Sequence, residues 1–163
     1  MPAPRLHENV IADRIIDIIR SNLEGTLGLK VVTLGALELY PALDQLGDAI
    51  PAVFVKPAPS TALERITTGQ TYRVTYSFRI VFVKPFAADE EIVKAKVADT
   101  QKIAEVLIDN VDLGGLTIPN GQILFSTLQS IEWEPPEDNL VATVNADATA
   151  TAMVFTVSTT SRK

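Results

Sequence analysis

The sequence holds few residues whose chemistry suggests catalysis, and His7 is the first of them. It is the only histidine among 163 residues, and it lies near the first turn of an expected helix without a serine or carboxylate pattern around it. A histidine serves as a general base only when a second group holds its proton in place. We therefore expect His7 to have a surface or half-buried structural role.

Four acidic residues surround Pro135-Pro136, namely Glu132, Glu134, Glu137 and Asp138. Carboxylate oxygens suit a hard cation such as Ca2+, but a calcium loop also needs a glycine and a ligand spacing that are missing here. A solvated hairpin turn explains the cluster better. Because cysteine and the glycine-rich phosphate motifs are also absent, the sequence predicts no catalytic residue, no metal site, no cofactor and no enzymatic activity.

Two arginines, Arg73 and Arg79, lie six positions apart in the segment 71–85, TYRVTYSFRIVFVKP. Apolar residues alternate along this segment, which predicts a strand with one buried face and both arginines on the other. Together with Arg65 they form a basic stripe, either as ordinary surface charge or as partners for ion pairs between subunits. Trp133 is the only tryptophan and is either a cap on the core or an interface anchor.

Hydrophobic periodicity predicts two helices, one near the start of the chain and one at 90–111. The apolar stripe of the first helix consists of Leu6, Val10, Ile11, Ile15, Ile18, Ile19 and Leu23. The stripe of the second helix consists of Ile92, Val93, Val97, Ile103, Ala104, Leu107 and Val111.

Strands are expected at 29–35, 52–56, 71–83, 122–134 and 140–157, in the order α-β-β-β-α-β-β. This order favours a single α+β domain over 1–163, with a mostly antiparallel sheet and two main helices packed on one face. Residues 57–70 are expected to form a long polar loop, and residues 161–163 a short basic tail.

Two of these strands lose their polar face at one end. Val81 and Val83 follow the alternating part of 71–83, and Met153, Val154 and Phe155 do the same near the end of 140–157. Either both helices cover these ends, or a neighbouring subunit does. The second interpretation would make Phe155 an interface residue.

The last of these segments is also too long for the domain. A continuous strand over 140–157 would reach about 59 Å, whereas a domain of this size has a diameter of roughly 40 Å. We therefore expect this strand to bend, to break at a bulge or to protrude.

The formal charge of −6 excludes a general electrostatic attraction to nucleic acid. The first residues lack an apolar signal core, and no run approaches the roughly 20 apolar residues that span a bilayer. The sequence thus favours a soluble protein of the cytoplasmic side, with no membrane partner.

The order of elements and the segments that fill it resemble the tail terminator (tail completion) proteins of tailed bacteriophages. The likeness lies in HENVIADRIIDIIRSNL, in IPAVFV, in the loop before TYRVTYSFRIVFVKP, in the following helix, and in the closing segment from QILFSTLQSIEWEPPEDN onward. It covers most of the chain and contains no diagnostic motif.

This resemblance implies a structural virion protein that forms a hexameric ring on the head-proximal end of the tail tube. Such a ring ends tube polymerisation and docks the head connector, so its partners are itself, the tube protein, the connector and, in a contractile tail, the sheath. The protein would be found in the host cytoplasm during assembly and in the virion afterwards. Another connector or neck ring protein is an alternative, and a small-molecule-binding or enzymatic α+β domain is an alternative from a different class.

The resemblance also assigns roles to single residues. Subunit or tail contacts would involve Arg65, Arg73, Arg79, Trp133 and Phe155. Acidic residues facing a lumen through which DNA passes would include Glu64, Glu132, Glu134 and Asp147.

The acidic composition generates a first prediction. Purified protein should show no appreciable DNA retention at low salt, because its net charge repels the phosphate backbone. A filter-binding or gel-shift titration at about 50 mM salt measures this. Tight retention under that condition would contradict the idea of a repulsive lumen.

Overall fold

A computed structural model describes residues 6–35, 49–58, 61–66, 71–85, 90–144 and 148–162. Its helices are α1 (Glu8–Leu27), α3 (Glu90–Asp109) and α4 (Pro136–Val144). Its strands are β1 (Val31–Leu34), β2 (Ala52–Pro57), β3 (Ala62–Arg65), β4 (Thr71–Pro85), β5 (Thr117–Ile118), β6 (Gly121–Glu132) and β7 (Ala148–Arg162). None of the described helices is long and apolar enough to cross a membrane.

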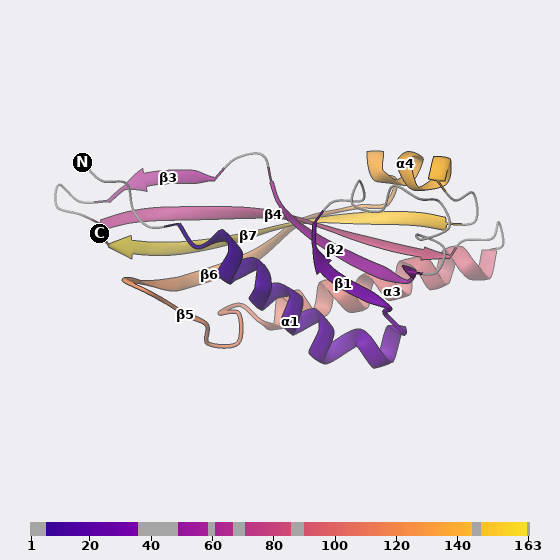
Figure 1. The fold of residues 1–163 in the computed structure, drawn as a ribbon, viewed down its shortest axis with the longest axis horizontal. Helices are drawn as coiled ribbons and strands as arrows, with labels where there is room; N and C mark the ends of the chain where they lie inside the picture. The colour runs from indigo at the N-terminus through magenta and orange to yellow at the C-terminus, as the bar shows by residue number, and fades with distance from the viewer. Residues whose placement is uncertain are drawn as a thin grey trace.

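The described strands form one sheet in the order β1-β2-β4-β7-β6-β5, with β3 paired to the beginning of β4. Every pairing is antiparallel except that of β1 with β2. The two central strands, β4 and β7, pair over their whole length, from Thr71 opposite Arg162 to Pro85 opposite Ala148. Figure 1 shows the resulting elongated molecule.

The sheet is longer than the helices that cover it. The 15 residues of β4 span about 50 Å, whereas the 20 residues of α1 span about 30 Å. At one end the strands therefore run past the helices, on the left of Figure 1. We refer to this end, formed by β3, 71–75, 158–162 and 121–125, as the arm.

Helices α1 and α3 pack on one face of the sheet, which we term the helix face. The main core lies there, and it joins alternate residues of β4 such as Tyr76 and Phe78 to Ile15 of α1 and Leu107 of α3. Val74 through Phe82 contribute every second residue, all at most 1% exposed, as the period-two pattern predicted. The expected α+β class with a mostly antiparallel sheet and these two helices on one face is confirmed.

The predicted helix stripes are buried only in their middle parts. Five members of the α1 stripe are buried, but Leu6 and Val10 are 47% and 42% exposed. In the second stripe, Val93 of α3 and Val111 just after it are likewise exposed. The apolar period therefore extends past the region that the sheet covers.

A second apolar cluster lies on the opposite face, at the end of the sheet far from the arm. It contains Val81 and Val83 of β4, which are 2% and 0% exposed, together with Phe54 and Ile50. Val141 of α4 and the alanines of β7, namely Ala148, Ala150 and Ala152, complete it. The interpretation that a neighbouring copy must cover the end of β4 is therefore wrong, because Val141 of α4 and Ile50 in the same chain pack against it.

Helix α4 is the main departure from the predicted elements. Residues 140–144 were expected to begin the last strand, yet they belong to a helix that starts at Pro136 and carries Glu137 and Asp138 in its first turn. Proline and acidic residues favour the first turn of a helix, a signal that the alternating Ala-Thr pattern concealed. The last strand thus begins only at Ala148, but its 15 residues still span about 50 Å, so it protrudes past the helices in the arm.

Two smaller departures concern the arm. The expected loop at 57–70 contains β3, whose four residues are all exposed. The expected tail at 161–163 instead continues β7 as far as Arg162. Both segments are polar and short, so their strand character depends on pairing with β4 more than on their own pattern.

Packing beneath α4 generates a second prediction. Ala150→Leu should lower the free energy of unfolding by about 1–3 kcal/mol, because the added atoms have no room between β7 and α4. Urea unfolding followed by circular dichroism measures the change. Ala98→Leu on the exposed side of α3 is the matched control, and equal effects of the two substitutions would contradict the close packing.

Candidate assembly surface

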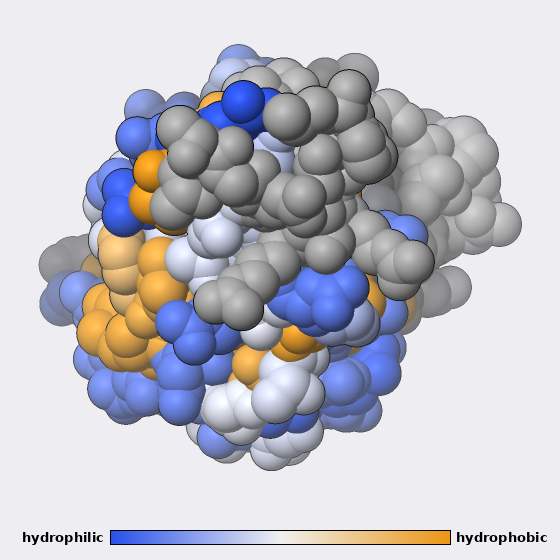
Figure 2. All heavy atoms as spheres, turned by 90° about the vertical axis from the view of Figure 1, so that its left-hand side faces the viewer, coloured by the Kyte–Doolittle hydropathy of each residue, from blue (hydrophilic) through white to orange (hydrophobic). Residues whose placement is uncertain are grey.

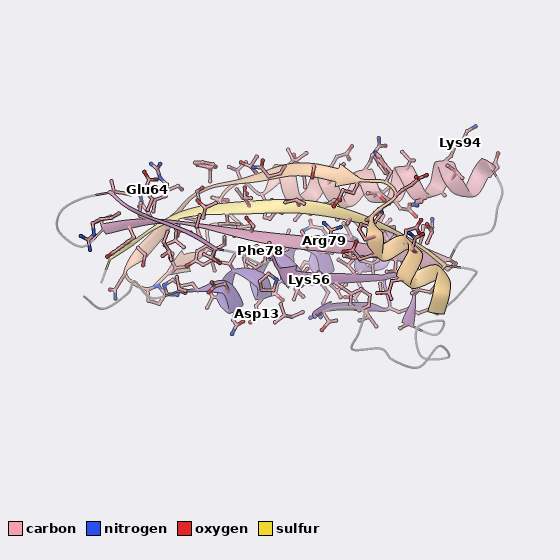
Figure 3. All side chains as sticks on the ribbon, turned by 90° about the horizontal axis from the view of Figure 1, so that it is seen from above. Asp13, Lys56, Glu64, Phe78, Arg79 and Lys94 are labelled. Atoms are coloured by element: carbon pink, nitrogen blue, oxygen red, sulfur yellow. The ribbon has the colours of Figure 1, made fainter. Side chains whose placement is uncertain are left out.

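The most heavily bonded of the predicted site residues is Arg79, which joins three elements within the chain. Its Nη1 donates to Oε2 of Glu132 in β6 at 2.5 Å, and its Nη2 donates to Oε2 of Glu137 in α4 at 2.8 Å. Nε also donates to Glu137, which makes that contact a two-point one. Figure 3 shows Arg79 beside α4. Arg79 is therefore a clamp on α4, and its charge is used within the chain.

This clamp changes the ionisation of its members. The hydrogen bond from Arg79 lowers the pKa of Glu137 although burial acts in the opposite direction, and the same bond raises the pKa of Arg79. Lys56 lies opposite Arg79 in the register of β2 and β4 and also helps to lower the pKa of Glu137. Glu132 and Glu137, read in the sequence as part of a solvated turn, thus hold α4 to the sheet.

A second set of polar contacts joins α4 and α3 to the beginning of β7. Asp138 Oδ1 accepts hydrogen bonds from the Thr149 hydroxyl at 2.8 Å and from the Ala150 amide at 2.9 Å. Lys96 Nζ donates to Thr149 Oγ1 and to the Trp133 carbonyl. This end of the molecule is consequently well connected within one chain.

At the arm, Arg65 and Arg73 lie on opposite sides of the sheet. Arg73 is 3.6 Å from a carboxylate oxygen of Glu64, with half of its side chain exposed. Arg65 lies over the ring of Tyr72 and donates to its hydroxyl at 3.1 Å. Figure 3 shows Glu64 at this end of the molecule. The three predicted arginines are thus not brought together, since Arg79 is distant from the other two.

The remaining predicted residues have different positions. Trp133 is 38% exposed after the end of β6, and Glu134 beside it is exposed. Phe155 is 0% exposed in the main core, so its prediction as an interface residue is wrong for this fold. Asp147 lies outside the described residues.

His7 packs against Tyr76 in the core. Its backbone amide donates to the Tyr76 hydroxyl at 3.1 Å, and burial raises the pKa of that tyrosine. His7 itself is 8% exposed, more buried than the sequence suggested. Within the described ranges, no group of three or more His, Cys, Asp or Glu residues could hold a metal ion.

A hollow of about 570 Å3 on the arm is lined by Thr71, Asn120, Gly121, Gln122 and Thr160. These residues are uncharged and mostly polar. A small-molecule site is more often apolar with a few convergent polar groups. The hollow therefore gives little support to an enzymatic or ligand-binding role.

Exposed apolar side chains provide a stronger signal than any of these polar residues. Leu63 in β3 and Ile66 after it are 52% and 45% exposed. Across the sheet, Ile108, Val111 and Phe125 are 55%, 51% and 49% exposed. Figure 2 views the molecule from the arm end and shows apolar patches among hydrophilic surface.

Apolar side chains exposed at two edges of one sheet are typical of interaction surfaces. The sequence reasoning missed this surface. It had read the edge at 57–70 as a polar loop, and Val111 as part of the core. The unusual pair Leu63 and Ile66 within that otherwise polar segment was the available signal.

Comparison with known proteins shows whether this fold occurs elsewhere. No protein-family model matches the sequence, and no curated protein matches it. Among solved structures, a chain described as "Virion of native gene transfer agent (GTA) particle" is similar over 92% of this chain and 96% of that chain. The TM-score is 0.52 at 16% sequence identity, so the likeness shows a shared fold.

The Arg79 clamp generates a third prediction, on pH dependence. The folded state lowers the pKa of Glu137 from its ordinary value of 4.5, so its stabilisation is complete above that value and is lost as the pH falls through the lower, folded value. Glu137→Gln should cost about 1.5–3 kcal/mol at pH 7 and flatten the loss of stability on acidification. Urea midpoints between pH 7 and pH 3 measure both effects.

The matched control is Glu134→Gln, which removes an exposed carboxylate from the neighbouring segment. It should leave both the midpoint and its pH dependence close to those of the parent protein. If the two glutamine variants had the same acid dependence, the clamp would not be the cause.

Proposed function

We propose that this protein is a structural component of a phage-like virion, a tail terminator that forms a hexameric ring on the head-proximal end of the tail tube. The ring would end tube polymerisation and offer the surface on which the head connector docks. The proposal rests on one observation above all, the shared fold with a virion chain over nearly the full length of both chains.

Two features of the molecule suit this role. Its strongest polar contacts, those of Arg79 and Asp138, are made within one chain and give a rigid body at one end. Leu63, Ile66 and Phe125 are exposed on the arm, whereas the body also exposes apolar residues such as Val93 and Leu140. A subunit with a rigid body and two apolar edges is suited to repeated contacts with copies of itself and with a tube.

Net charge supports the same role. A ring through which DNA passes must not bind it, and the protein carries six more negative than positive charges at pH 7. Repulsion from phosphate is then the default. Glu64 and Glu134 are exposed and remain candidates for the lumen, whereas Glu132 is engaged by Arg79.

A fourth prediction tests this function. Added to growing tail tubes, the protein should stop elongation and appear as a ring at one end of each tube in negative-stain images. Deletion of residues 60–69, which removes β3 and its flanks, should reduce attachment by about tenfold or more, equivalent to about 1.4 kcal/mol or greater. Co-sedimentation with tubes measures attachment.

The control for the deletion is Lys30→Glu, an exposed change away from the arm. Circular dichroism checks that the deleted protein keeps its core, whose residues lie outside 60–69. Attachment that is unchanged by the deletion would show that the contact surface lies elsewhere, and binding to the head connector without any effect on tubes would favour a neck ring protein.

A further inference from the structure

Resting on the proposed ring, we propose how its subunits meet: β3 of one copy lies antiparallel beside the outer edge of β6 of the next copy. In the same contact, Arg65 reaches the acidic end of α3 in that next copy. The occupant of each edge is thus a second copy of this chain, and each copy uses two different surfaces.

Strand β6 provides an edge with little protection. Only Gly121 and Gln122 pair with β5, and the Ser126 amide is bonded to the Val111 carbonyl at 2.9 Å. Beyond these points, β6 has no further strand partner on its outer side among the described residues. The stretch 122–131 contains no charged residue and no proline, although charge and proline are the usual means of protecting an edge.

The end of α3 beside this edge has an unbalanced charge. Glu105, Asp109 and Asp112 are all exposed, and none forms an ion pair with another described residue. The last turn of α3 contains no basic residue, so these carboxylates lie near the negative end of the helix dipole. Arg14 is nearby, but it donates to the carbonyls of Leu113 and Gly114.

Exposed apolar groups lie close to these carboxylates in the sequence. Ile108 is in the last turn of α3 and Val111 follows the helix. Phe125 of β6 is exposed as well, but on the opposite face of the sheet. Carboxylates next to exposed apolar surface favour a partner that brings both a cation and apolar side chains. Arginine is the side chain that most often meets both requirements.

Strand β3 carries this complementary set. Leu63 of β3 and Ile66 directly after it are exposed apolar residues. Arg65 is held over Tyr72 by a cation–π contact and a hydrogen bond. A guanidinium that is already oriented loses less conformational entropy when it binds. Its outer edge has no partner among the described residues, since β3 pairs only with β4.

The direction of the strands fits a repeating contact. Across the arm the order is β3, β4, β7 and β6, and each neighbouring pair is antiparallel. Consequently β3 and β6 of one copy run in opposite directions. A second copy in the same orientation would place its β3 antiparallel to β6, which continues the alternation.

The faces match as well. Arg65 pairs with Tyr72, whose side chain packs against the main core, so Arg65 lies on the helix face. The end of α3 lies on that face too. Ala62 and Glu64 lie on the opposite face with Arg73, as do Phe125 and Thr127 on β6, which pair with Ser158 and Thr156 of β7.

A contact between two different edges is heterologous, so it generates a ring when the rotation between copies closes. β5 and the Val111 carbonyl occupy the beginning of the β6 edge, which directs the incoming β3 toward Thr127–Ile131. Such a stagger along the strand is also what a closed, curved arrangement of strands requires.

Disulfide crosslinking tests this contact, because the chain contains no native cysteine. Ala62→Cys is combined in turn with Gln129→Cys and with Ser130→Cys, and mild oxidation is applied over a range of protein concentrations. Within one copy, β4 and β7 lie between position 62 and β6, a separation of about 14 Å of strand spacing, well beyond the roughly 7 Å reach of a disulfide. A ladder of covalent multimers is therefore expected only from contacts between copies.

Controls separate this contact from others. Each single-cysteine variant should give at most a dimer, and the pair Ala62→Cys with Asp17→Cys, on the exposed side of α1, should give no ladder. An efficient dimer from Ala62→Cys alone would indicate a symmetric β3–β3 contact and overturn the inference. The absence of a ladder at every concentration would also overturn it.

Charge exchange provides a second measurement on the same variants. Arg65→Glu and Asp109→Arg should each reduce crosslinking by about tenfold or more, and the double variant should restore it. Lys30→Glu, an exposed change away from the arm, should have no effect. Failure of the double variant to recover would contradict the pairing of Arg65 with the end of α3.

The result is distinguishable from that of the tube assay. Rings seen by light scattering that give no ladder would overturn this contact and leave the proposed function standing. A ladder from a protein that does not act on tubes would support the contact and remove the tail terminator role.

Discussion

The continuous antiparallel pairing of β4 with β7 is the interaction on which the other parts of the molecule depend. These strands pair from Thr71 opposite Arg162 to Pro85 opposite Ala148, and every other strand except β1 and β5 attaches directly to one of them. One half of this pair is covered on both faces, by α1 and α3 on one side and by α4 on the other. The arm is the part that continues beyond this double cover. A rigid body and a projecting sheet thus arise from one pair of strands.

The division between body and arm also explains why the charged residues serve different purposes. Near the covered end, Arg79 and Lys84 are bonded to carboxylates of α4, β6 and α3. These partly buried ion pairs orient the helices on the sheet. Removing one member of such a pair lowers the stability of the fold, because the other charge remains partly buried without a partner. In the arm, Arg73 and Glu64 are exposed, so their attraction contributes little to stability.

Sequence patterns predicted the parts of the fold that have a strong period. The alternation in 71–85 and the stripes of the two long helices gave the main sheet and the main core. The patterns failed where two signals competed, as at 136–144, where a proline and acidic helix start precedes an Ala-Thr alternation. They also failed for β3, because an exposed four-residue strand has no buried face to generate a period.

Single site residues were harder to predict than the fold, and the reason is geometric. Whether Arg79 meets a carboxylate of its own chain or of a neighbour depends on where α4 lies, and the sequence prediction missed α4. Phe155 is apolar at a strand end, which is equally compatible with a core and with an interface. The exposure of residues at the end of α3, such as Ile108, could not be predicted either. It depends on how much of the helix packs on the sheet, which only the structure shows.

The central pairing has a consequence for the order in which a copy becomes competent to assemble. Residues of β4 and β7 that face each other are far apart along the chain, Thr71 and Arg162 most of all, and such distant pairings form slowly. Strand β6 depends on β7 for its place in the sheet, since the rest of its pairing is the short contact with β5. A chain interrupted before β7 would therefore lack a fixed β6 edge. If copies join through the β6 edge as proposed, a truncated copy would be unable to offer that edge to its neighbour.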